Sequence, residues 1–437
     1  MRRATRVLGF AMAAAVLLAV AVAAAPRAFV YVLEVDGVID PPVASYVERG
    51  IEAGEEDKAQ AVIVRLNTPG GLDDSMRDIT QAMLNAQVPV VVYVAPVGAR
   101  AASAGAIITL ASHVAAMAPS TNIGAAHPVA MGGGEMTDEM SKKVENDAAS
   151  TARSIAERRG RNAKWAEDAV RESISSTAKE ALKEKVIDII AEDTEDLLKQ
   201  LDGRKVKLPR RTVTLKTADA DAEDLPMTFI ERFLHILSNP NLAYIFLIIG
   251  MYGIIFELQN PGAIYPGVIG VICLIMGFYS LAVLPVNLAG LVLLILGVVM
   301  LIVDIWAPSH GALTFGGIIA FAVGSLMLYG GRSTPFLRVS WLTVMMMTAL
   351  TAGFFLFVAG LGVRAHWTKI TTGVEGLVGA RGKARTALSP TGSVFVAGEL
   401  WRAVAEGDET IEAGQEVEVV AMDGFTLRVR RRESGEI

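Results

Sequence analysis

The chain has 437 residues, long enough for two or three domains that each bury a core. Its composition is 52% hydrophobic and 20% charged with a net charge of −6, so no nucleic-acid partner is expected. The single cysteine, Cys273, excludes an internal disulfide, and the 5 histidines show no metal-binding spacing such as HExxH. We therefore expect neither a metal nor another cofactor.

Residues 1–28 have the pattern of a secretory signal peptide. Arg2, Arg3 and Arg6 precede an uncharged Ala/Val/Leu run over 7–25, and small residues follow. An uncleaved anchor helix is the alternative interpretation. In either case the arginines keep the start of the chain in the cytoplasm, so the next domain is expected outside it.

Residues 29–200 are predicted to form an α/β domain, because short β-branched segments alternate with segments of helical apolar spacing. The expected strands are 29–35, 61–66, 89–94 and 186–191, and the expected helices are 42–54, 73–87, 138–159 and 163–172. Such alternation favours parallel strands joined by crossover connections. Residues 201–239 are charged or turn-rich over much of their length and are predicted as a linker, with a small appended β element as the alternative.

Residues 240–363 are predicted to form a membrane domain. Because a bilayer core needs about 20 apolar residues per helix, the segment accommodates about five spans. These are 240–258, 264–284, 288–306, 311–329 and 340–363. The protein is therefore expected to be a multi-pass protein of the cell membrane. Starting outside, five spans place the C-terminal part in the cytoplasm, although two arginines in the last external loop run against the positive-inside trend.

Residues 371–437 return to a soluble composition and are predicted to form a small all-β domain. The expected strands are 377–386, 393–397, 400–405, 415–422 and 425–429. Five short strands joined by glycine-containing turns favour an OB-like barrel, since closure removes exposed strand edges.

A Pro-Gly-Gly turn directly follows the expected strand 61–66, in the sequence NTPGG at 67–71. At the carboxyl end of a parallel strand, glycines let backbone N–H groups approach a ligand without obstruction by a Cβ atom. Such amides are suited to stabilising an oxyanion. The alternative is an ordinary strand-to-helix turn.

Ser103 stands among small residues in GARAASAGA at 98–106, and an apolar helix is expected directly after it. A hydroxyl at a helix N-terminus gains from the local positive potential as it becomes an alkoxide. The Ala104 N–H would lie beside the forming oxyanion. A serine that merely caps the helix is the alternative.

A serine nucleophile needs a base, and two residues compete for this role. Lys143 begins KVEND at 143–147 in an expected helix; a lysine base must be neutral, which burial or a nearby positive field favours. His127, in GAAHP at 124–128, is the rival because imidazole titrates near neutral pH. Spacing alone does not decide between them.

Four motifs together resemble one protein family. They are NTPGG at 67–71, AASAG at 101–105, MAPSTNIGAAHP at 117–128 and KVEND at 143–147. With the apolar helical block and terminal barrel, they are similar to the long-form NfeD-like membrane serine proteases, Clp-protease-class enzymes related to signal peptide peptidase A. The resemblance covers essentially the whole chain, and the combination is specific although each motif alone is weak.

The resemblance implies a crotonase-like spiral for the first domain and a Ser–Lys dyad of Ser103 and Lys143. It also implies oxyanion donors at Gly70, Gly71 and Ala104. Archaeal members are associated with stomatin-type membrane proteins and cleave an apolar stretch near the stomatin C-terminus. We therefore expect a stomatin-like partner or substrate, contact with membrane lipid, and homo-oligomerisation.

His127 is a departure from this pattern, because soluble Clp proteases use a histidine base at a similar distance after the serine and this chain has both residues. We favour Lys143, with His127 as the alternative base. Two other functions compete with a membrane-anchored endopeptidase. The first is a non-catalytic membrane scaffold for a stomatin-like partner. The second is a crotonase-fold acyl-CoA enzyme, against which the predicted export argues because coenzyme A chemistry belongs to the cytoplasm.

Overall fold

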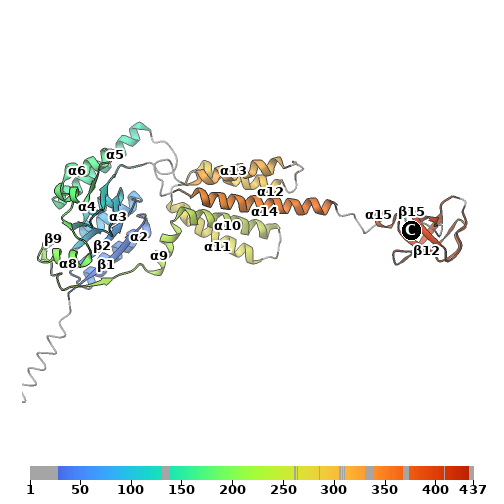
Figure 1. Cartoon of the computed structure of the whole chain (residues 1–437), viewed down its shortest axis with the longest axis horizontal. Coiled ribbons are helices and arrows are strands. Elements are labelled where there is room, and N and C mark those ends of the chain that lie inside the picture. The colour runs from blue at the N-terminus through green and yellow to red at the C-terminus, as the bar shows by residue number, and fades with distance from the viewer. Residues whose placement is uncertain are drawn as a thin grey trace, which may run out of the picture. The chain divides into compact units, whose positions relative to one another are not determined.

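The structure is a computed structural model of the chain (Figure 1). It describes residues 28–129, 137–259, 262, 264–284, 286–304, 307, 309, 311–329, 338–367, 374–407 and 409–432. The chain divides into two compact units, Met1–Thr351 and Ala352–Ile437. The predicted signal peptide, apart from residue 28, lies outside the described residues.

The first unit contains a sheet of six parallel strands in the order β11-β1-β2-β3-β5-β8 (Figure 1). They are β1 (Phe29–Asp36), β2 (Ala61–Asn67), β3 (Val90–Val94), β5 (Val114–Met117), β8 (Ile189–Ile190) and β11 (Asp221–Asp224). Beside it, β4 (Arg100–Ala102), β6 (Asn122–Gly124) and β7 (Ser175–Thr177) form a small second sheet in the order β4-β6-β7.

The central strands β2 and β3 are buried on both faces because helices and loops cover each side. Their side chains alternate with the period of two expected of a strand: Val62 and Val64 join one apolar cluster, and Ala61 and Ile63 join the other. The first cluster holds residues of α2 (Pro41–Glu56), α3 (Asp73–Asn85), α4 (Ala104–Ala111), α5 (Asp138–Arg159), α6 (Ala163–Arg171) and α7 (Ala178–Lys183). The second holds residues of α8 (Thr194–Leu201).

This domain has more strands than the sequence-based prediction, which lacked β4, β6 and β7 as well as β5. Strand β5, with the sequence VAAM, was not predicted, because alanine carries little β-preference by itself and burial at all four positions decides the outcome. The expected last strand 186–191 pairs only at Ile189–Ile190, and Val186 and Ile187 are buried in the first apolar cluster instead.

Residues 201–239, predicted as a linker, contain ordered structure. Strands β9 (Lys205–Lys207) and β10 (Thr212–Thr214) form an antiparallel pair, and β11 joins the main sheet beside β1. A short helix, α9 (Phe229–Leu237), follows. The charged composition hid β11 because this edge strand is exposed at all four positions and has no apolar face.

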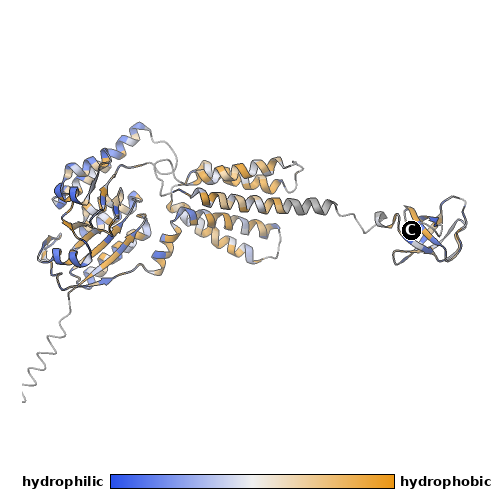
Figure 2. Cartoon of the chain, viewed as in Figure 1, coloured by the Kyte–Doolittle hydropathy of each residue, from blue (hydrophilic) through white to orange (hydrophobic). Residues whose placement is uncertain are grey.

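Five apolar helices follow: α10 (Pro240–Gln259), α11 (Ile264–Val283), α12 (Leu288–Val303), α13 (Ala312–Leu328) and α14 (Trp341–Trp367) (Figure 2). Helices α10 and α11 are long and apolar enough to cross a membrane, and α12, α13 and part of α14 are shorter apolar helices. A Cβ atom at Gly253 would lie 2.6 Å from Pro266 O, and one at Gly297 would lie 2.5 Å from Phe321 N. Glycines therefore allow close backbone packing within the pairs α10–α11 and α12–α13, as is common in membrane helices.

The second unit ends in a closed barrel of five strands in the order β12-β13-β14-β16-β15. They are β12 (Arg381–Ala384), β13 (Thr391–Val396), β14 (Glu399–Ala405), β15 (Glu416–Asp423) and β16 (Thr426–Arg431), preceded by α15 (Val374–Leu377). Alternate residues such as Val394, Val396, Leu427 and Val429 fill the interior. The five-stranded barrel predicted from the sequence is confirmed.

Candidate active site

Ser103 joins β4 to the N-terminus of α4 in a conformation that serine rarely adopts, with φ 53° and ψ −117°. Its backbone N–H donates to Gly124 O at 3.0 Å, which holds the serine against β6. The side chain makes no capping hydrogen bond to α4, so its hydroxyl does not serve the helix end. Strained backbone of this kind costs about 1–3 kcal/mol and is concentrated at functional sites.

The Pro-Gly-Gly turn lies directly against this serine. A Cβ atom on Gly70, whose φ is +124°, would lie 2.8 Å from Ser103 Cβ and 3.3 Å from Ser103 Oγ. A Cβ atom on Gly71 would lie 2.1 Å from Ile39 O. Ile39 holds the turn through two hydrogen bonds, from its own N–H to Gly70 O and from Leu72 N–H to its carbonyl. Both glycines are therefore required by close approach of neighbouring atoms.

Not all amides of the turn face the serine in the same way. The Gly70 N–H donates to Thr68 Oγ1 at 3.0 Å, and this hydroxyl in turn donates to Gly70 O. Gly71 and Ala104, in contrast, line the same cavity as Ser103. The sequence motif does not reveal the role of Thr68, because a buried threonine looks like any other β-branched residue at the end of a strand.

A cavity of about 420 Å³ opens beside Ser103. Its walls come from α3, the Ser103–α4 junction, the segment after β6, α5 and α6, and most of them are apolar. The lining residues are Gly71, Asp73, Met76, Arg77, Ser103, Ala104, Ile107, Ala126, Pro128, Val129, Met140, Lys143, Val144, Asp147, Ala148, Thr151 and Val170. The cavity thus contains the candidate nucleophile, one candidate base, and two candidate oxyanion donors.

Lys143 reaches this cavity from the second turn of α5, and it is exposed to solvent. Helix α5 begins at the Thr137 cap, carries Asp138 and Glu139 in its first turn and ends at the left-handed Gly160, so its boundaries follow ordinary capping rules.

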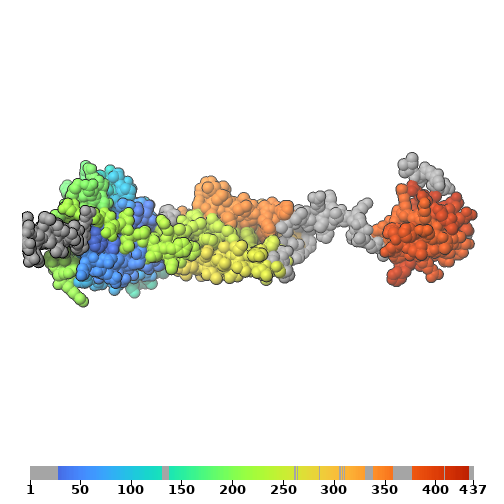
Figure 3. Space-filling model, turned by 90° about the horizontal axis from the view of Figure 1, so that it is seen from below, coloured from blue at the N-terminus to red at the C-terminus, as the bar shows by residue number. Residues whose placement is uncertain are grey.

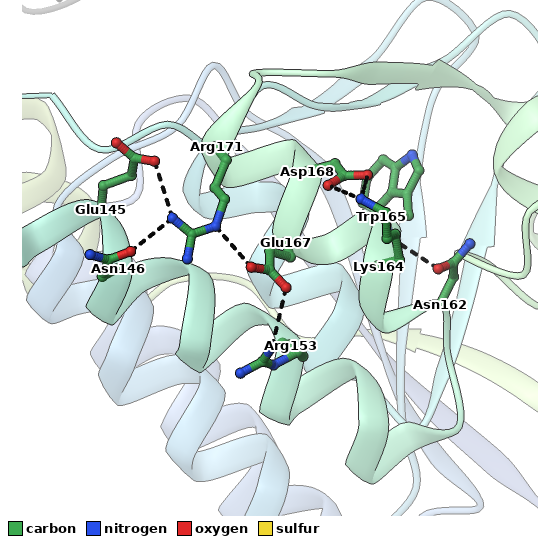
Figure 4. A network of polar contacts seen from close by, with 9 residues as sticks. All are labelled: Glu145, Asn146, Arg153, Asn162, Lys164, Trp165, Glu167, Asp168 and Arg171. Atoms are coloured by element: carbon green, nitrogen blue, oxygen red, sulfur yellow. Dashed lines mark hydrogen bonds and ion pairs between the residues drawn. The ribbon is translucent and has the colours of Figure 1, made fainter. Parts of the chain in front are cut away.

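The N-terminal half of α5 is held to α6 by the polar network in Figure 4. Arg171 of α6 donates to Asn146 Oδ1 at 2.8 Å and to Glu145 Oε1 at 3.3 Å. Its Nε donates to Glu167 Oε1 at 2.8 Å, and Glu167 also accepts from Arg153 of α5. Because Glu145 and Asn146 follow Lys143 by two and three residues, these bonds determine where the lysine stands relative to α6.

Arg77 crosses the cavity wall between α3 and α5. Its Nη2 lies 2.8 Å from Asp147 Oδ2, and its Nε lies 2.7 Å from Asp73 Oδ2. Asp147 stands one helical turn after Lys143, so the guanidinium engages the carboxylate that a lysine at this spacing would otherwise meet. The sequence gives no sign of the ion pair between Arg77 and Asp147, because these residues are far apart in the chain.

His127, the alternative base, lies outside the set of residues that line the Ser103 cavity. Its Nδ1 is 2.9 Å from Val170 O, a distance that assigns the proton to Nδ1. The histidine therefore links the segment after β6 to α6, whereas its neighbours Ala126 and Pro128 line the cavity.

The far end of α4, the helix that begins at Ser103, is capped by two arginines that the sequence did not indicate. Arg161 is buried and donates to Leu110 O and Ser112 O at 2.7 and 2.8 Å, and its Nη2 lies 2.7 Å from Asp188 Oδ2. Arg159 donates to Ala111 O at 2.7 Å. Burial, together with Arg161 and Arg158, lowers the pKa of Arg159 to about 10.

The histidine beside these arginines is held neutral. Burial, and then the charges of Arg159 and Arg161, lowers the pKa of His113 to about 3. Its Nδ1 accepts from the Val90 N–H at 3.2 Å, so this ring supports the sheet. Cations at the C-terminal end of α4 complement the helix dipole, whose positive end lies at Ser103.

The sequence matches three models of one family in chain order. The model of the NfeD1b N-terminal domain matches residues 29–207, the NfeD integral membrane domain matches 241–361, and the NfeD-like C-terminal, partner-binding domain matches 374–431. Over 418 residues, the chain is 36% identical to "Membrane-bound protease PH1510" of Pyrococcus horikoshii. The aligned region covers 93% of this chain and 95% of that protein. The chain belongs to the NfeD family.

A second relative of this NfeD protein is "Membrane protein NfeD1b" of Bacillus subtilis, 29% identical over 250 residues and covering 57% of this chain and 55% of that protein. Among solved structures, a mutant of the 1510-N membrane-bound stomatin-specific protease in complex with a substrate peptide is 36% identical. It covers 48% of this chain and 98% of that one, with a TM-score of 0.45. The C-terminal domain of the stomatin operon partner protein 1510-C from P. horikoshii is 43% identical, covering 14% of this chain and 98% of that one, with a TM-score of 0.14.

These matches confirm the predicted family and fold class. The NfeD protein has a Clp-protease-like α/β domain, a membrane region of apolar helices and a small closed β-barrel, in that order. It is a membrane protein, and its barrel corresponds to the family's partner-binding domain.

Proposed function

We propose that this NfeD protein is a membrane-anchored serine endopeptidase in which Ser103 is the nucleophile and Lys143 the base. The observation that supports this assignment best is the shared cavity, which holds a strained serine at the head of α4 and a lysine from α5. His127 is the weaker candidate because it does not line that cavity.

In the proposed reaction, Ser103 Oγ attacks the scissile carbonyl carbon while its proton passes to Lys143 Nζ. The N–H groups of Gly71 and Ala104 stabilise the oxyanion, and Gly70 would join them only by giving up its bond to Thr68 Oγ1. The protonated lysine then gives its proton to the leaving amine as the acyl-enzyme forms. Water, with Lys143 again as the base, attacks the ester and releases the new carboxylate and Ser103.

The exposed position of Lys143 implies a role for the substrate. A lysine acts as a base only in its neutral form, and removal from water favours that form. An apolar peptide segment that fills the cavity would cover the lysine and displace its solvent. Catalysis would then start only when the cavity is occupied, which suits a protease with an otherwise open site.

The apolar lining also indicates the substrate class. Met76, Ile107, Val129, Met140 and Val144 form much of the wall, so the site suits aliphatic or aromatic side chains. We therefore propose that the enzyme cleaves apolar segments of membrane proteins. A stomatin-like protein is the proposed partner or substrate, because the 1510-N relative is described as stomatin-specific and the barrel matches a partner-binding domain. A non-catalytic scaffold for such a partner is the second candidate.

We further propose that α10–α14 make the protein multi-pass, in contact with membrane lipid, with the protease domain outside the cytoplasm and the barrel inside. Five apolar helices support this arrangement, and an odd number of spans separates the two soluble domains by the membrane. Homo-oligomerisation is proposed by analogy with the protease family.

The test uses the full chain in lipid nanodiscs and a peptide that copies the apolar C-terminal segment of a stomatin-like protein. Wild type is compared with Ser103→Ala, Lys143→Ala and His127→Ala. Lys142→Ala is the matched control, because Lys142 is the exposed neighbour on α5 and does not line the cavity.

We expect cleavage to fall by at least about 10³-fold in the Ser103 and Lys143 variants and to persist in the Lys142 and His127 variants. Loss in His127→Ala with retention in Lys143→Ala would transfer the base to histidine. Cleavage that survives Ser103→Ala would refute the serine mechanism. A folded wild type that binds the peptide without cleaving any apolar sequence would favour the scaffold.

A further inference from the structure

Helix α9 (Phe229–Leu237) has its polar side toward the protein and its apolar side outward. On the inner side, Arg49 of α2 makes two hydrogen bonds to Glu231, at 2.9 and 2.8 Å. One turn later, His235 Nδ1 lies 2.7 Å from Asp40 Oδ2. A helix on the surface of a soluble domain has the reverse arrangement, with its apolar stripe turned to the core.

The outer side of α9 carries four large apolar residues, which we call the α9 face. They are Phe229, Ile230, Phe233 and Ile236, with exposed fractions of 82%, 67%, 36% and 48%. Their spacing of three and four residues places them on one side of the helix. The rings of Phe229 and Phe233 stack with centroids 6.1 Å apart, so the patch is continuous. Exposed apolar patches of this kind mark an interaction surface.

The position of α9 in the chain identifies what covers this face. After two residues, α9 continues into α10, a helix long and apolar enough to span a membrane. The side chain of Ser280 in α11 donates to Leu237 O at 2.7 Å, which holds the end of α9 against the base of the membrane helices. Helix α9 therefore lies beside the first apolar helices, α10 and α11, as its position in Figures 2 and 3 also shows.

The charges around α9 agree with a lipid environment. Its acidic residue and its histidine are both bonded to the protease domain and turned away from the α9 face. The exposed Arg232 stands one turn before Ile236, so helical spacing places it at the edge of that face. Apolar residues flanked by a basic side chain are the arrangement of helices that lie in the interface of a bilayer.

We propose that α9 is an interfacial helix whose face of Phe229, Ile230, Phe233 and Ile236 inserts among the lipids at the outer edge of the bilayer. It thereby fixes the protease domain to the membrane surface through Asp40 and Arg49. This assignment concerns residues between the segments that the N-terminal and membrane-domain family models match, 29–207 and 241–361. It rests on the proposed topology, in which α10 and α11 cross the membrane and the protease domain lies outside the cytoplasm.

The test places a nitroxide label on the full chain, in a Cys273→Ser background, reconstituted in vesicles of phosphatidylcholine and phosphatidylglycerol. The test position is Phe233→Cys, with Ile230→Cys as a second position on the same face. Ile275→Cys, on an outward position of α11 that is 63% exposed, is the lipid reference. Lys199→Cys, on the exposed side of α8, is the aqueous reference. The spin relaxation of each label is measured with oxygen, which enters lipid, and with a water-soluble nickel chelate.

We expect the labels on the α9 face to resemble Ile275→Cys, with high accessibility to oxygen and at least tenfold lower accessibility to nickel than Lys199→Cys. Nickel accessibility equal to that of Lys199→Cys would overturn the proposal. Protection from both reagents with spin–spin broadening would also overturn it, because a second copy of the chain would then cover the face. An aqueous signal at Ile275→Cys would instead refute the proposed membrane span, so the two failures are distinguishable.

Discussion

The carboxylate of Asp40 and the imidazole of His235 lie 2.7 Å apart and connect the protease domain to the helix that leads into the membrane region. Asp40 also caps α2 through Oδ1, which accepts from the Val43 N–H at 3.0 Å. The residue before it, Ile39, holds both ends of the Gly70–Gly71 turn. One short segment therefore contacts the membrane-proximal helix on one side and the candidate oxyanion turn on the other.

The Asp40–His235 pair predicts a pH-dependent stability. The hydrogen bond to Asp40 raises the pKa of His235 above its ordinary value, although burial acts in the opposite direction. A histidine with a raised pKa in the folded state contributes stability that is fully present below the unfolded-state pKa of about 6.5 and is lost as the pH rises through the folded-state pKa. Asp40 and Tyr279 are the other titratable side chains in this cluster.

We expect His235→Gln to destabilise the full chain by about 1–2 kcal/mol near pH 5.5 and by less near pH 8.5, because a charge-assisted hydrogen bond is lost. The measurement is thermal unfolding in detergent at both pH values. Asp40→Asn, which can still cap α2, is expected to remove the same pH dependence. An equal effect of His235→Gln at the two pH values would contradict this account.

The strained backbone of Ser103 predicts that a variant which relieves the strain is more stable than the wild type, although it is inactive. Glycine adopts φ near 53° without penalty, so we expect Ser103→Gly to stabilise the protein by about 1 kcal/mol while abolishing cleavage. Ser103→Ala is the matched control, since it removes the hydroxyl but retains the Cβ atom. A Ser103→Gly variant no more stable than Ser103→Ala in denaturant unfolding would show that the backbone is not strained.

The close approach of Ile39 to the Pro-Gly-Gly turn predicts that a methyl group on Gly71 is not tolerated. The added Cβ would lie 2.1 Å from Ile39 O, so the turn has to move. We expect Gly71→Ala to cost about 2 kcal/mol and to lower kcat more than it raises KM, because the oxyanion donors shift. Gly353→Ala in α14 is the control, as its Cβ would enter open space. Wild-type kcat in Gly71→Ala would remove the turn from the mechanism.

The buried Arg161 predicts a large and specific loss of stability. Replacement by methionine leaves the carbonyls of Leu110 and Ser112 without their donor and removes the contact with Asp188. We expect Arg161→Met to cost about 3 kcal/mol in chemical denaturation. Arg158→Met serves for comparison. Arg158 is exposed, and within the described residues its hydrogen bond is a long one, to Leu84 O at 3.4 Å, so its loss should cost under about 0.5 kcal/mol. Similar costs for the two variants would refute the capping role.

Local patterns predicted the elements around the site well. Strands β1, β2 and β3 and helices α5 and α6 lie within two residues of the expected boundaries, because period-two and helical apolar spacing act over neighbouring residues. Strands β5 and β11 were missed for opposite reasons: β5 is an alanine-rich buried strand, and β11 is a fully exposed edge strand. Both are decided by their place in the sheet, which local composition does not encode.

The sequence by itself determined the order of the three regions, the turn that carries Gly70 and Gly71, and the two candidates for the base, Lys143 and His127. These features depend on local composition and on residue chemistry. Only the tertiary structure decided that Lys143 shares a cavity with Ser103 while His127 bonds Val170 O, because α5 and α6 bring together residues far apart in the chain. It alone decided that α9 turns Glu231 and His235 inward, since the partners Arg49 and Asp40 lie almost 200 residues earlier.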